Sequence, residues 1–221
     1  MERWMLLRKT DVVDGALKFL DVEGLDGLTM RKLGATLNVQ GGALYRHFPN
    51  KSALLAAMAD KLVEGVGDPL PDAPWHEQIH ILGDRFRTAL LAHRDGARLL
   101  GEFDRSLATG TNTTSAGDLA INVLCGAGLP PAQAGWLAFA LFYYVLGHTI
   151  EEQAQVNPRV GDNWRGRGTR LAADVSPHYA EALDSLTSSD PAQRFTYGLS
   201  VFIEGIATQI PTTLPAAHPA R

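Results

Sequence analysis

Residues 28–51 read LTMRKLGATLNVQGGALYRHFPNK and contain two short amphipathic segments separated by a tight turn. In the first segment, Thr29 can cap a helix over residues 30–37 by accepting a backbone N–H bond. Leucines four residues apart then share the inward face of this helix. Asn38 can adopt the left-handed backbone conformation that ends the helix, and Val39 fills the corner that follows. The pattern therefore predicts a helix, a tight turn and a second helix.

The second helix is expected from about residue 40 to just before Pro49, because the residue ahead of a proline avoids helical geometry. Its first turn carries almost no side chains, so the backbone there can approach the floor of a DNA major groove. Asn50 can cap the helix that comes next. The stretch has no acidic residue, and its basic side chains are Arg31, Lys32, Arg46, His47 and Lys51. Two short helices with this spacing and charge are typical of a helix-turn-helix that docks on DNA.

The run G-L-T-x-R-K-L followed by A-L-Y-R-H-F-x-N-K resembles the TetR family of one-component transcriptional repressors over roughly the first sixty residues. The resemblance implies phosphate contacts from Thr29, Tyr45, His47 and Lys51, a base contact from Arg31, and a specificity segment made of Gln40, Gly41, Gly42, Ala43 and Arg46. The three small residues Gly41, Gly42 and Ala43 stand where the tetracycline repressor class of this family carries larger polar ones. We therefore expect Arg31, Gln40 and Arg46 to carry most of the direct base readout.

The composition supports a DNA-binding head on an acidic body. The 221-residue chain has a net charge of −4, but residues 1–51 carry +2 and residues 52–221 carry −6. Such a distribution suits a protein that presents one face to DNA. The single cysteine, Cys125, cannot form an internal disulfide and indicates a reducing cytoplasm. No amino-terminal signal sequence is found, and the apolar stretch 134–150 indicates a buried helix in preference to a membrane span.

Hydrophobic periodicity predicts an all-α chain without strands or internal repeats. Residues 65–74 contain three prolines and two glycines, which places the domain boundary there. The expected division is a DNA-binding domain with its connecting helix at 1–64, an effector-binding and dimerisation domain at 65–210, and a flexible tail at 211–221. Helices are expected at about 9–24, 51–64, 75–92, 96–108, 115–127, 131–155, 177–186 and 191–210, with Pro131, Asp190 and Pro191 at their starts.

Two of these helices are apolar on more than one side. Residues 134–150 and 195–207 carry bulky apolar side chains around most of their circumference, with small residues between them. A helix buried on two sides in so small a chain needs a central position or a partner. The family resemblance favours a partner, since the corresponding helices of such repressors pair across a two-fold axis. A homodimer would read two half-sites of a palindromic operator together.

The segments 93–98 and 147–153 resemble the effector-binding half of the tetracycline repressor class. Phe86 and Glu151 match residues that line the drug site of that class, Glu151 through a bound magnesium ion. However, Leu99 and Leu100 stand where the metal-binding histidine would be, and leucines offer no ligand to a hard cation. We therefore expect a smaller or more apolar effector, with neither metal nor cofactor. The expected pocket residues are Leu82, Phe86, Leu100, Phe103, Trp136, Phe139, Tyr143, His148 and Glu151.

Each of these positions has a simpler alternative. Aromatic residues at helical spacing often form the core or a dimer interface, His148 can be a hydrogen-bonded core histidine, and Glu151 can face solvent. The Gly- and Arg-rich loop 156–174 is a solvated segment or a lid. An enzyme is not expected, because the sequence lacks H-E-x-x-H, a Gly-rich phosphate loop and a basic partner for Cys125.

The sequence thus predicts a homodimeric, ligand-responsive transcriptional repressor. Entry of a small effector into the body would bias the helix at 51–64 and move the two recognition helices out of register with the major grooves. The alternative is a DNA-binding regulator whose body serves dimerisation or protein contacts, without a small-molecule effector.

Overall fold

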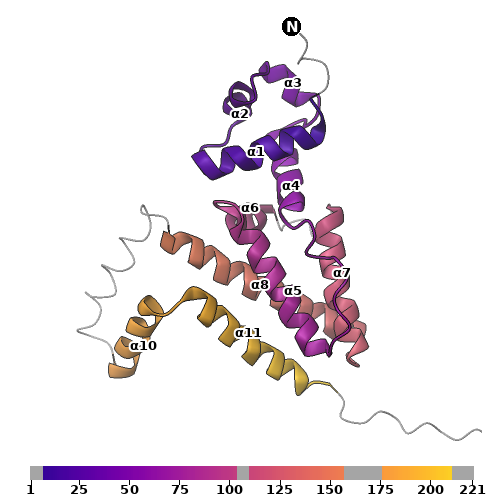
Figure 1. The fold of residues 1–221 in the computed structure, drawn as a ribbon, viewed down its shortest axis with the longest axis vertical. Coiled ribbons are helices and arrows are strands. Elements are labelled where there is room, and N and C mark those ends of the chain that lie inside the picture. Colours follow the sequence, from indigo (N-terminus) through magenta and orange to yellow (C-terminus); the bar gives the residue numbers. More distant parts are fainter. Residues whose placement is uncertain (1–6, 104–109, 157–175, 211–221) are drawn as a thin grey trace, which may run out of the picture.

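The computed structural model describes residues 7–103, 110–156 and 176–210, and all regular secondary structure in these ranges is helical (Figure 1). The head and its connecting helix comprise α1 (Lys9–Glu23), α2 (Met30–Thr36), α3 (Gly41–Tyr45) and α4 (Lys51–Leu62). The body comprises α5 (Trp75–Leu91), α6 (Gly96–Phe103), α7 (Thr111–Gly126), α8 (Pro131–Val156), α10 (Pro177–Ser188) and α11 (Pro191–Ala207). The predicted all-α class is confirmed. The expected lid and tail, at residues 157–174 and 211–221, lie outside the described residues.

The head forms a small core between α1 and the two short helices. α1 buries an apolar stripe at helical spacing, made of Val12, Val13, Ala16, Leu17, Phe19 and Leu20. Leu33 of α2 and Leu44 of α3 are fully buried against this core, and Phe48 closes it after α3. A pair of helices as short as α2 and α3 cannot bury its own apolar side chains, so α1 and α4 supply the covering surface.

The capping residues of the head lie where the sequence predicts them. The Thr29 hydroxyl accepts the Lys32 N–H bond at 3.2 Å, and the Asn50 side chain accepts the Ala53 N–H bond at 2.8 Å. Asn38 has a φ of 54° and ends the first of the two short helices. These three residues therefore set the limits of the helix-turn-helix.

The second short helix is shorter than predicted. α3 ends at Tyr45, whereas the sequence predicts a helix up to Phe48. The backbone continues in i→i−3 hydrogen bonds, from Arg46 N–H to Ala43 O and from His47 N–H to Leu44 O. Two glycines in the first turn weaken the helix, and tightening of the last turn before Pro49 accounts for the rest of the difference.

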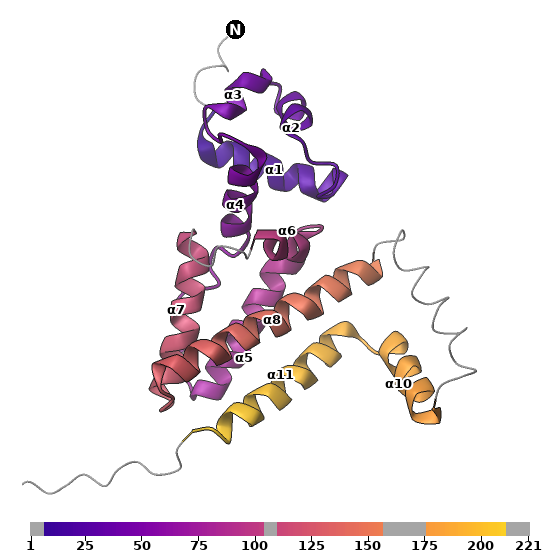
Figure 2. The same cartoon turned by 180° about the vertical axis from the view of Figure 1, so that it is seen from behind.

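In the body, α5, α7 and α8 pack against one another, and α6 fills the space between α4, α5 and α8. Both views show α11 running alongside α8, with α10 beyond its end (Figure 2). The core of this layer contains Ile79, Leu90, Leu124, Val145 and Leu199. Within the described ranges, no helix combines the length and apolar character needed to cross a bilayer.

The head contacts the body through α4 and through the loop after α1. The Asp21 carboxylate accepts the Arg94 N–H bond at 3.0 Å and lies 3.0 Å from Nδ1 of His93. The Asp95 carboxylate accepts the Leu25 N–H bond at 2.9 Å. These polar contacts join the end of α1 to the turn between α5 and α6, so the head is held at two places.

Candidate DNA interface and effector cavity

The predicted DNA-contacting residues lie on one end of the molecule. Arg31, Gln40, Tyr45, Arg46 and Lys51 are exposed, with 53% of the Tyr45 surface accessible. Gly42 is also exposed, Ala43 and His47 are half-buried, and Gly41 lies in the same first turn of α3. The Thr29 hydroxyl is engaged in the α2 cap. The helix-turn-helix thus presents basic and polar side chains to solvent and keeps its apolar ones inside.

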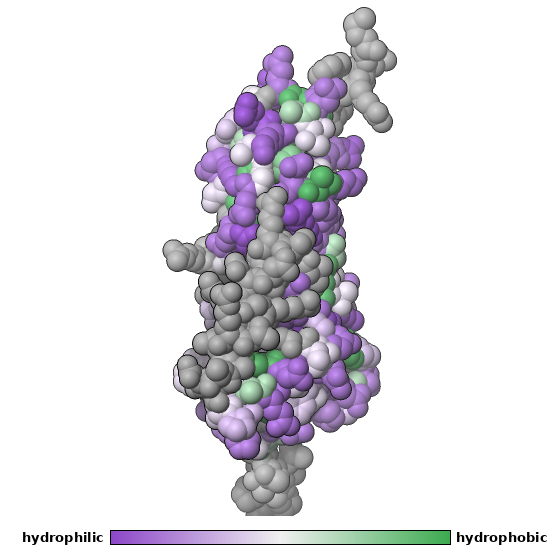
Figure 3. All heavy atoms as spheres, turned by 90° about the vertical axis from the view of Figure 1, so that its left-hand side faces the viewer, coloured by the Kyte–Doolittle hydropathy of each residue, from purple (hydrophilic) through white to green (hydrophobic). Residues whose placement is uncertain are grey.

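The surface of the head agrees with a polar binding face. In the side view, hydrophilic residues predominate on the head, and hydrophobic ones are scattered singly (Figure 3). Buried Leu44 and Phe48 alternate with the exposed side chains of α3 and the turn after it. Because the exposed side chains of this face include the basic Arg31, Arg46 and Lys51, the face suits a polyanion.

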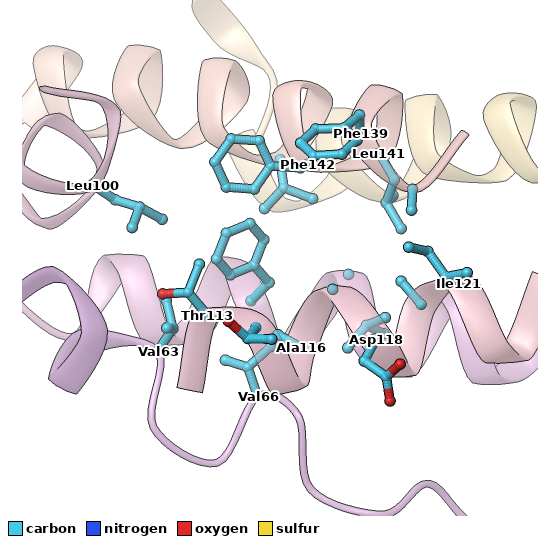
Figure 4. Close-up of a pocket in the computed structure, with 18 residues that line it drawn as sticks. Val63, Val66, Leu100, Thr113, Ala116, Asp118, Ile121, Phe139, Leu141 and Phe142 are labelled. Carbon is cyan, nitrogen blue, oxygen red and sulfur yellow. The ribbon is translucent and has the colours of Figure 1, made fainter. Parts of the chain in front are cut away.

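A cavity of about 390 Å³ lies in the body, directly below the end of α4. Phe139 and Phe142 of α8 lie along one side of it, and Val63, Val66, Thr113 and Ala116 lie along the opposite side (Figure 4). The other lining residues are Leu82, Gly83, Phe86, Leu100, Thr114, Gly117, Asp118, Ala120, Ile121, Ala138, Leu141 and Val145. The walls come from α5, α6, α7, α8, the C-cap residue of α4 and the loop after it.

The cavity lining is almost wholly apolar. Its polar side chains are Thr113, Thr114 and Asp118, and it contains no lysine, arginine or histidine among the described residues. Asp118 is exposed and accepts a hydrogen bond from the Asn122 amide at 3.0 Å. Its carboxylate points away from the phenyl rings (Figure 4). Phe86 stacks on Phe142 with ring centroids 5.5 Å apart, which gives the cavity an aromatic wall.

The structure places four of the nine predicted pocket residues around this cavity, namely Leu82, Phe86, Leu100 and Phe139. Trp136 and Tyr143 lie outside it, with 72% and 56% of their surfaces exposed, because they occupy the outer side of α8. Glu151 is also exposed and does not line the cavity. The side chain of Phe103, at the end of α6, lies outside the described residues.

His148 belongs to α8, and its side chain faces α11 and not the cavity. Its ring meets Phe195 edge-on at a centroid distance of 5.3 Å, and neither ring nitrogen has a hydrogen bond to a described residue. Nδ1 lies 3.8 Å from the Glu152 carboxylate, beyond hydrogen-bond reach, while Glu152 forms a two-bond ion pair with Arg87. Burial lowers the pKa of His148 below its ordinary value. The expected alternative of a hydrogen-bonded core histidine is therefore also wrong for this ring.

Sequence reasoning missed the contribution of α7 and of the loop after α4. α7 supplies seven lining residues, including Thr113 and Ile121, and the end of α4 supplies Val63. These side chains are small or aliphatic and resemble ordinary core residues in the sequence. The sequence feature that indicates a cavity here is a run of small side chains on α7. Thr113, Thr114, Ala116 and Gly117 leave space that larger side chains would fill.

Both parts of the chain match models of known protein families. Residues 12–58 match the family model for bacterial regulatory proteins of the tetR family, and residues 68–210 match the model for the tetracyclin repressor-like C-terminal domain. The chain belongs to the TetR family. As a TetR family member it is a DNA-binding helix-turn-helix regulator of transcription and not an enzyme.

Individual TetR family proteins show the same relationship over nearly the whole chain. The tetracycline repressor of class A from transposon 1721 of Escherichia coli is 36% identical over 206 residues, 91% of each chain. A possible TetR family regulator from Streptomyces coelicolor A3(2) superimposes with a TM-score of 0.81 at 38% identity, covering 91% of this chain and 100% of that one.

Two further TetR family structures contain bound partners. BioQ, a Mycobacterium smegmatis protein, has been solved with its double-stranded DNA operator; it gives a TM-score of 0.70 at 32% identity, over 92% of this chain and 99% of that one. ActR from Streptomyces coelicolor has been solved with (S)-DNPA and gives a TM-score of 0.78 at 30% identity, over 93% and 100%. These proteins share both halves of the fold with this chain.

The residues of this TetR family member do not fit the magnesium site implied by its resemblance to the tetracycline repressor class. Glu151 is exposed and does not line the cavity, and Leu99 and Leu100 are buried apolar side chains. Among the described residues, no group of three or more His, Cys, Asp or Glu side chains converges. Asp118 is the one carboxylate of the lining, and one oxygen-donating side chain of this kind does not make a site for a hard cation.

Proposed function

We propose that the chain is a homodimeric repressor that binds a palindromic operator and is released by a small apolar effector. The observation that carries the proposal is the position of the cavity, whose wall includes Val63, the C-cap residue of α4, and Val66 in the turn that follows. The other end of α4 begins at Lys51, next to the helix-turn-helix. An effector in the cavity therefore contacts the C-cap residue of the helix that carries the head. As the sequence predicts, the proposed site of action is the cytoplasm.

In the proposed complex, the head at residues 1–64 reads the operator and the body at 65–210 binds the effector and dimerises. Arg31, Gln40 and Arg46 contact base edges, because these exposed side chains are long enough to reach into the major groove. Phosphate contacts come from Thr29, Tyr45, His47 and Lys51. The backbone at Gly41, Gly42 and Ala43 approaches the groove closely, since it presents little side-chain bulk.

The lining of the cavity indicates the class of effector. Aromatic and aliphatic walls favour an uncharged compound, because no cationic side chain of the described lining would neutralise an anion. The Thr113 hydroxyl donates to the Asp60 carboxylate and the Thr114 hydroxyl donates to the Gly110 carbonyl, so each can accept one hydrogen bond from a polar group of the ligand. The volume of about 390 Å³ is near the lower end of the range for small-molecule sites. A compact, largely aromatic molecule without a chelated metal fits these conditions.

The outer faces of α8 and α11 supply the proposed dimer interface. Trp136 and Tyr143 on α8 are exposed, as are Tyr197 and Val201 on α11, where the exposed fractions are 74% and 51%. An added Cβ at Gly147 or Gly205 would meet no atom of another described part of the chain within 4 Å. Large apolar side chains beside small ones on two adjacent helices favour pairing with a second copy.

Operator binding is tested with a duplex from the region upstream of the chain's own gene, by fluorescence anisotropy at several salt concentrations. Lys51→Ala is expected to lower the slope of log K against log salt by about two, because each protomer of the proposed dimer loses one phosphate contact. Lys61→Ala is the matched control, since Lys61 lies at the far end of the same helix. Equal slopes for the two variants, or no binding of the duplex at low salt, would contradict the DNA-binding proposal.

Effector binding is tested with N-phenyl-1-naphthylamine, an uncharged apolar fluorophore, and with uncharged aromatic compounds that displace it. Phe86→Ala is expected to weaken binding of the fluorophore by about tenfold, the loss for an aromatic contact of about 1.4 kcal/mol. Tyr179→Ala, an exposed position on α10, serves as the control. Addition of EDTA should change nothing. If no compound that displaces the fluorophore changes the affinity for the operator, the result favours the alternative, a regulator whose body serves dimerisation or protein contacts without a small-molecule effector.

A further inference from the structure

The amino-terminal end of α7 is capped by a residue of another helix. Gly110 occupies the capping position and has no side chain to offer. Instead, Oδ1 of Asp60 on α4 accepts the N–H bonds of Asn112 at 2.9 Å and Thr113 at 3.1 Å. The Asn112 side-chain amide donates to Oδ2 of Asp60 at 3.2 Å and to its backbone carbonyl at 3.1 Å. The Thr113 hydroxyl lies 3.3 Å from the same carboxylate.

This contact explains why α7 begins earlier than the sequence predicts. The first N–H groups of a helix have no partner within the helix and favour a negative charge beside them. Residues 111–114 are poor helix formers, so the sequence predicts a start at residue 115. The Asp60 carboxylate supplies the missing acceptor and extends the helix to Thr111. The cap is long-range, because the bonded residues are 52 and 53 positions apart in the sequence.

Gly110 permits the close approach of the two helices. A Cβ atom added at Gly110 would overlap the Asp60 carboxylate, closer than two non-bonded atoms can lie. The φ of Gly110 is −109°, which any residue can adopt. The glycine is therefore needed for space and not for backbone conformation. A substitution at either Asp60 or Gly110 can disrupt the contact.

The contact also lies beside the cavity. Asp60 is about one helical turn before Val63, the C-cap residue of α4, which lines the cavity. Thr113 both bonds to Asp60 and lines the cavity from α7, and Thr114 lines it as well. Figure 4 shows Val63 and Thr113 next to each other in the wall. A ligand in the cavity therefore touches residues on both sides of the Asp60 contact.

We propose that Asp60 is a positioning residue that couples the orientation of α4, and with it the DNA head, to the first turn of α7. The inference rests on the proposed function, since it assigns a route between the cavity and the head. Displacement of the α7 end by a ligand changes the position of Asp60, and a change in the angle of α4 on operator binding changes the α7 cap. Coupling of this kind acts equally in both directions.

Operator DNA alone can therefore test the coupling. Hydrogen exchange of the Asn112 and Thr113 amides is followed in the full-length protein with and without the upstream duplex. In the wild-type protein, operator binding should change both exchange rates by threefold or more. Asp60→Ala should raise the rates in the free protein by about fivefold, the effect of losing a typical helix cap, and should abolish the response to DNA.

Three further variants separate coupling from simple capping. Asp60→Asn retains an oxygen acceptor and should keep the response to DNA, because asparagine is also a good capping residue. Gly110→Ala displaces the Asp60 carboxylate from the opposite side and should abolish the response. Asp84→Ala removes an exposed carboxylate of α5 and should behave as wild type. If Asp60→Ala fails to fold, the Asp60→Asn and Gly110→Ala variants still test the coupling.

The outcomes differ for the two proposals. A response to bound operator that persists in Asp60→Ala and Gly110→Ala would reduce Asp60 to a cap and overturn the coupling. The absence of any response in wild-type protein that binds the duplex would overturn it as well, while leaving the repressor function intact. Failure of the wild-type protein to bind the duplex would remove the proposed function, and the coupling with it.

Discussion

His148 is a partly buried imidazole whose surroundings favour its neutral form. Burial is the main cause of its lowered pKa; Arg87 and Arg194 act in the same direction, while Glu152 and Glu151 oppose them. The unfolded chain binds a proton near pH 6.5, and the folded chain does so only at lower pH. The free energy of unfolding therefore falls as the pH drops below about 6.5, by at most about 1.4 kcal/mol per pH unit from this group.

Urea denaturation at pH 7.5 and pH 5.5, at one protein concentration, measures this effect. His148→Phe should reduce the loss of stability on acidification, because the group that takes up the proton only in the unfolded chain is gone. His178→Gln, at an exposed position on α10, should retain the wild-type pH dependence. An unchanged pH dependence in His148→Phe would show that other groups cause the loss.

At the residue level, the sequence predicts local roles better than the direction of side chains. Thr29, Asn38 and Asn50 act on backbone atoms within three or four residues, so their roles follow from neighbouring positions. The placement of Tyr143 or His148 depends on which side of α8 faces α5, α7 or α11. An all-round apolar helix contains no periodic signal for that choice, which explains why the pocket was only partly predicted.

The crossing of α8 and α11 depends on a glycine. The Tyr144 hydroxyl donates to the Phe195 carbonyl at 2.7 Å, and the two rings stack with centroids 5.5 Å apart. A Cβ atom at Gly198 would overlap the Tyr144 hydroxyl and crowd its ring. Gly198→Ala is therefore expected to break this hydrogen bond and to lower the free energy of unfolding by about 1–3 kcal/mol, the usual cost of overpacking.

Gly135→Ala is the matched control for this prediction. It lies on α8 and an added Cβ there meets nothing within 4 Å, so the helix should gain about 0.5–1 kcal/mol from the better helix former. Urea denaturation of both variants measures the sign and size of each change in the free energy of unfolding. Equal effects of the two substitutions would mean that α8 and α11 do not cross at Gly198.

At the element level, the sequence predicts all the described helices, and the errors occur at the helix ends. The early start of α7 requires Asp60, and the tight end of α3 follows from its glycines together with Pro49. The limits of α4 and α8 are predicted within two residues because their caps and breaks are local. A cap from another helix leaves no trace in the segment that it caps.

The whole molecule has a head joined to a body by two kinds of contact. One is the Asp60 cap, and the other is the polar cluster around Asp21 and Asp95 at the loop after α1. Gln153 of α8 extends the second contact, because its side chain donates to the carbonyls of Leu90 and His93. A change in the packing of α7 or α8 therefore has a direct path to the orientation of the head.

At the scale of the whole molecule, the proposed function requires two copies of the chain. A single head presents one short reading segment, and two heads at a fixed spacing recognise both half-sites of a palindrome. Val201→Asp places a carboxylate in the proposed interface on α11, where 51% of the valine is exposed in the single chain. We expect this variant to be a monomer by sedimentation velocity at micromolar concentration, and to bind the upstream duplex at least about a hundredfold more weakly, since a buried unpaired charge costs about 3 kcal/mol or more.

Leu186→Asp gives the matched control, because Leu186 is an aliphatic residue of similar exposure, 43%, on α10 and away from the proposed interface. It should remain dimeric and bind the duplex like wild type. Circular dichroism establishes that both variants retain their helices, so a change in mass reflects association and not unfolding. A dimeric Val201→Asp protein with undiminished operator affinity would place the interface elsewhere, and the exposed aromatic face of α8 and α11 would then need a different occupant.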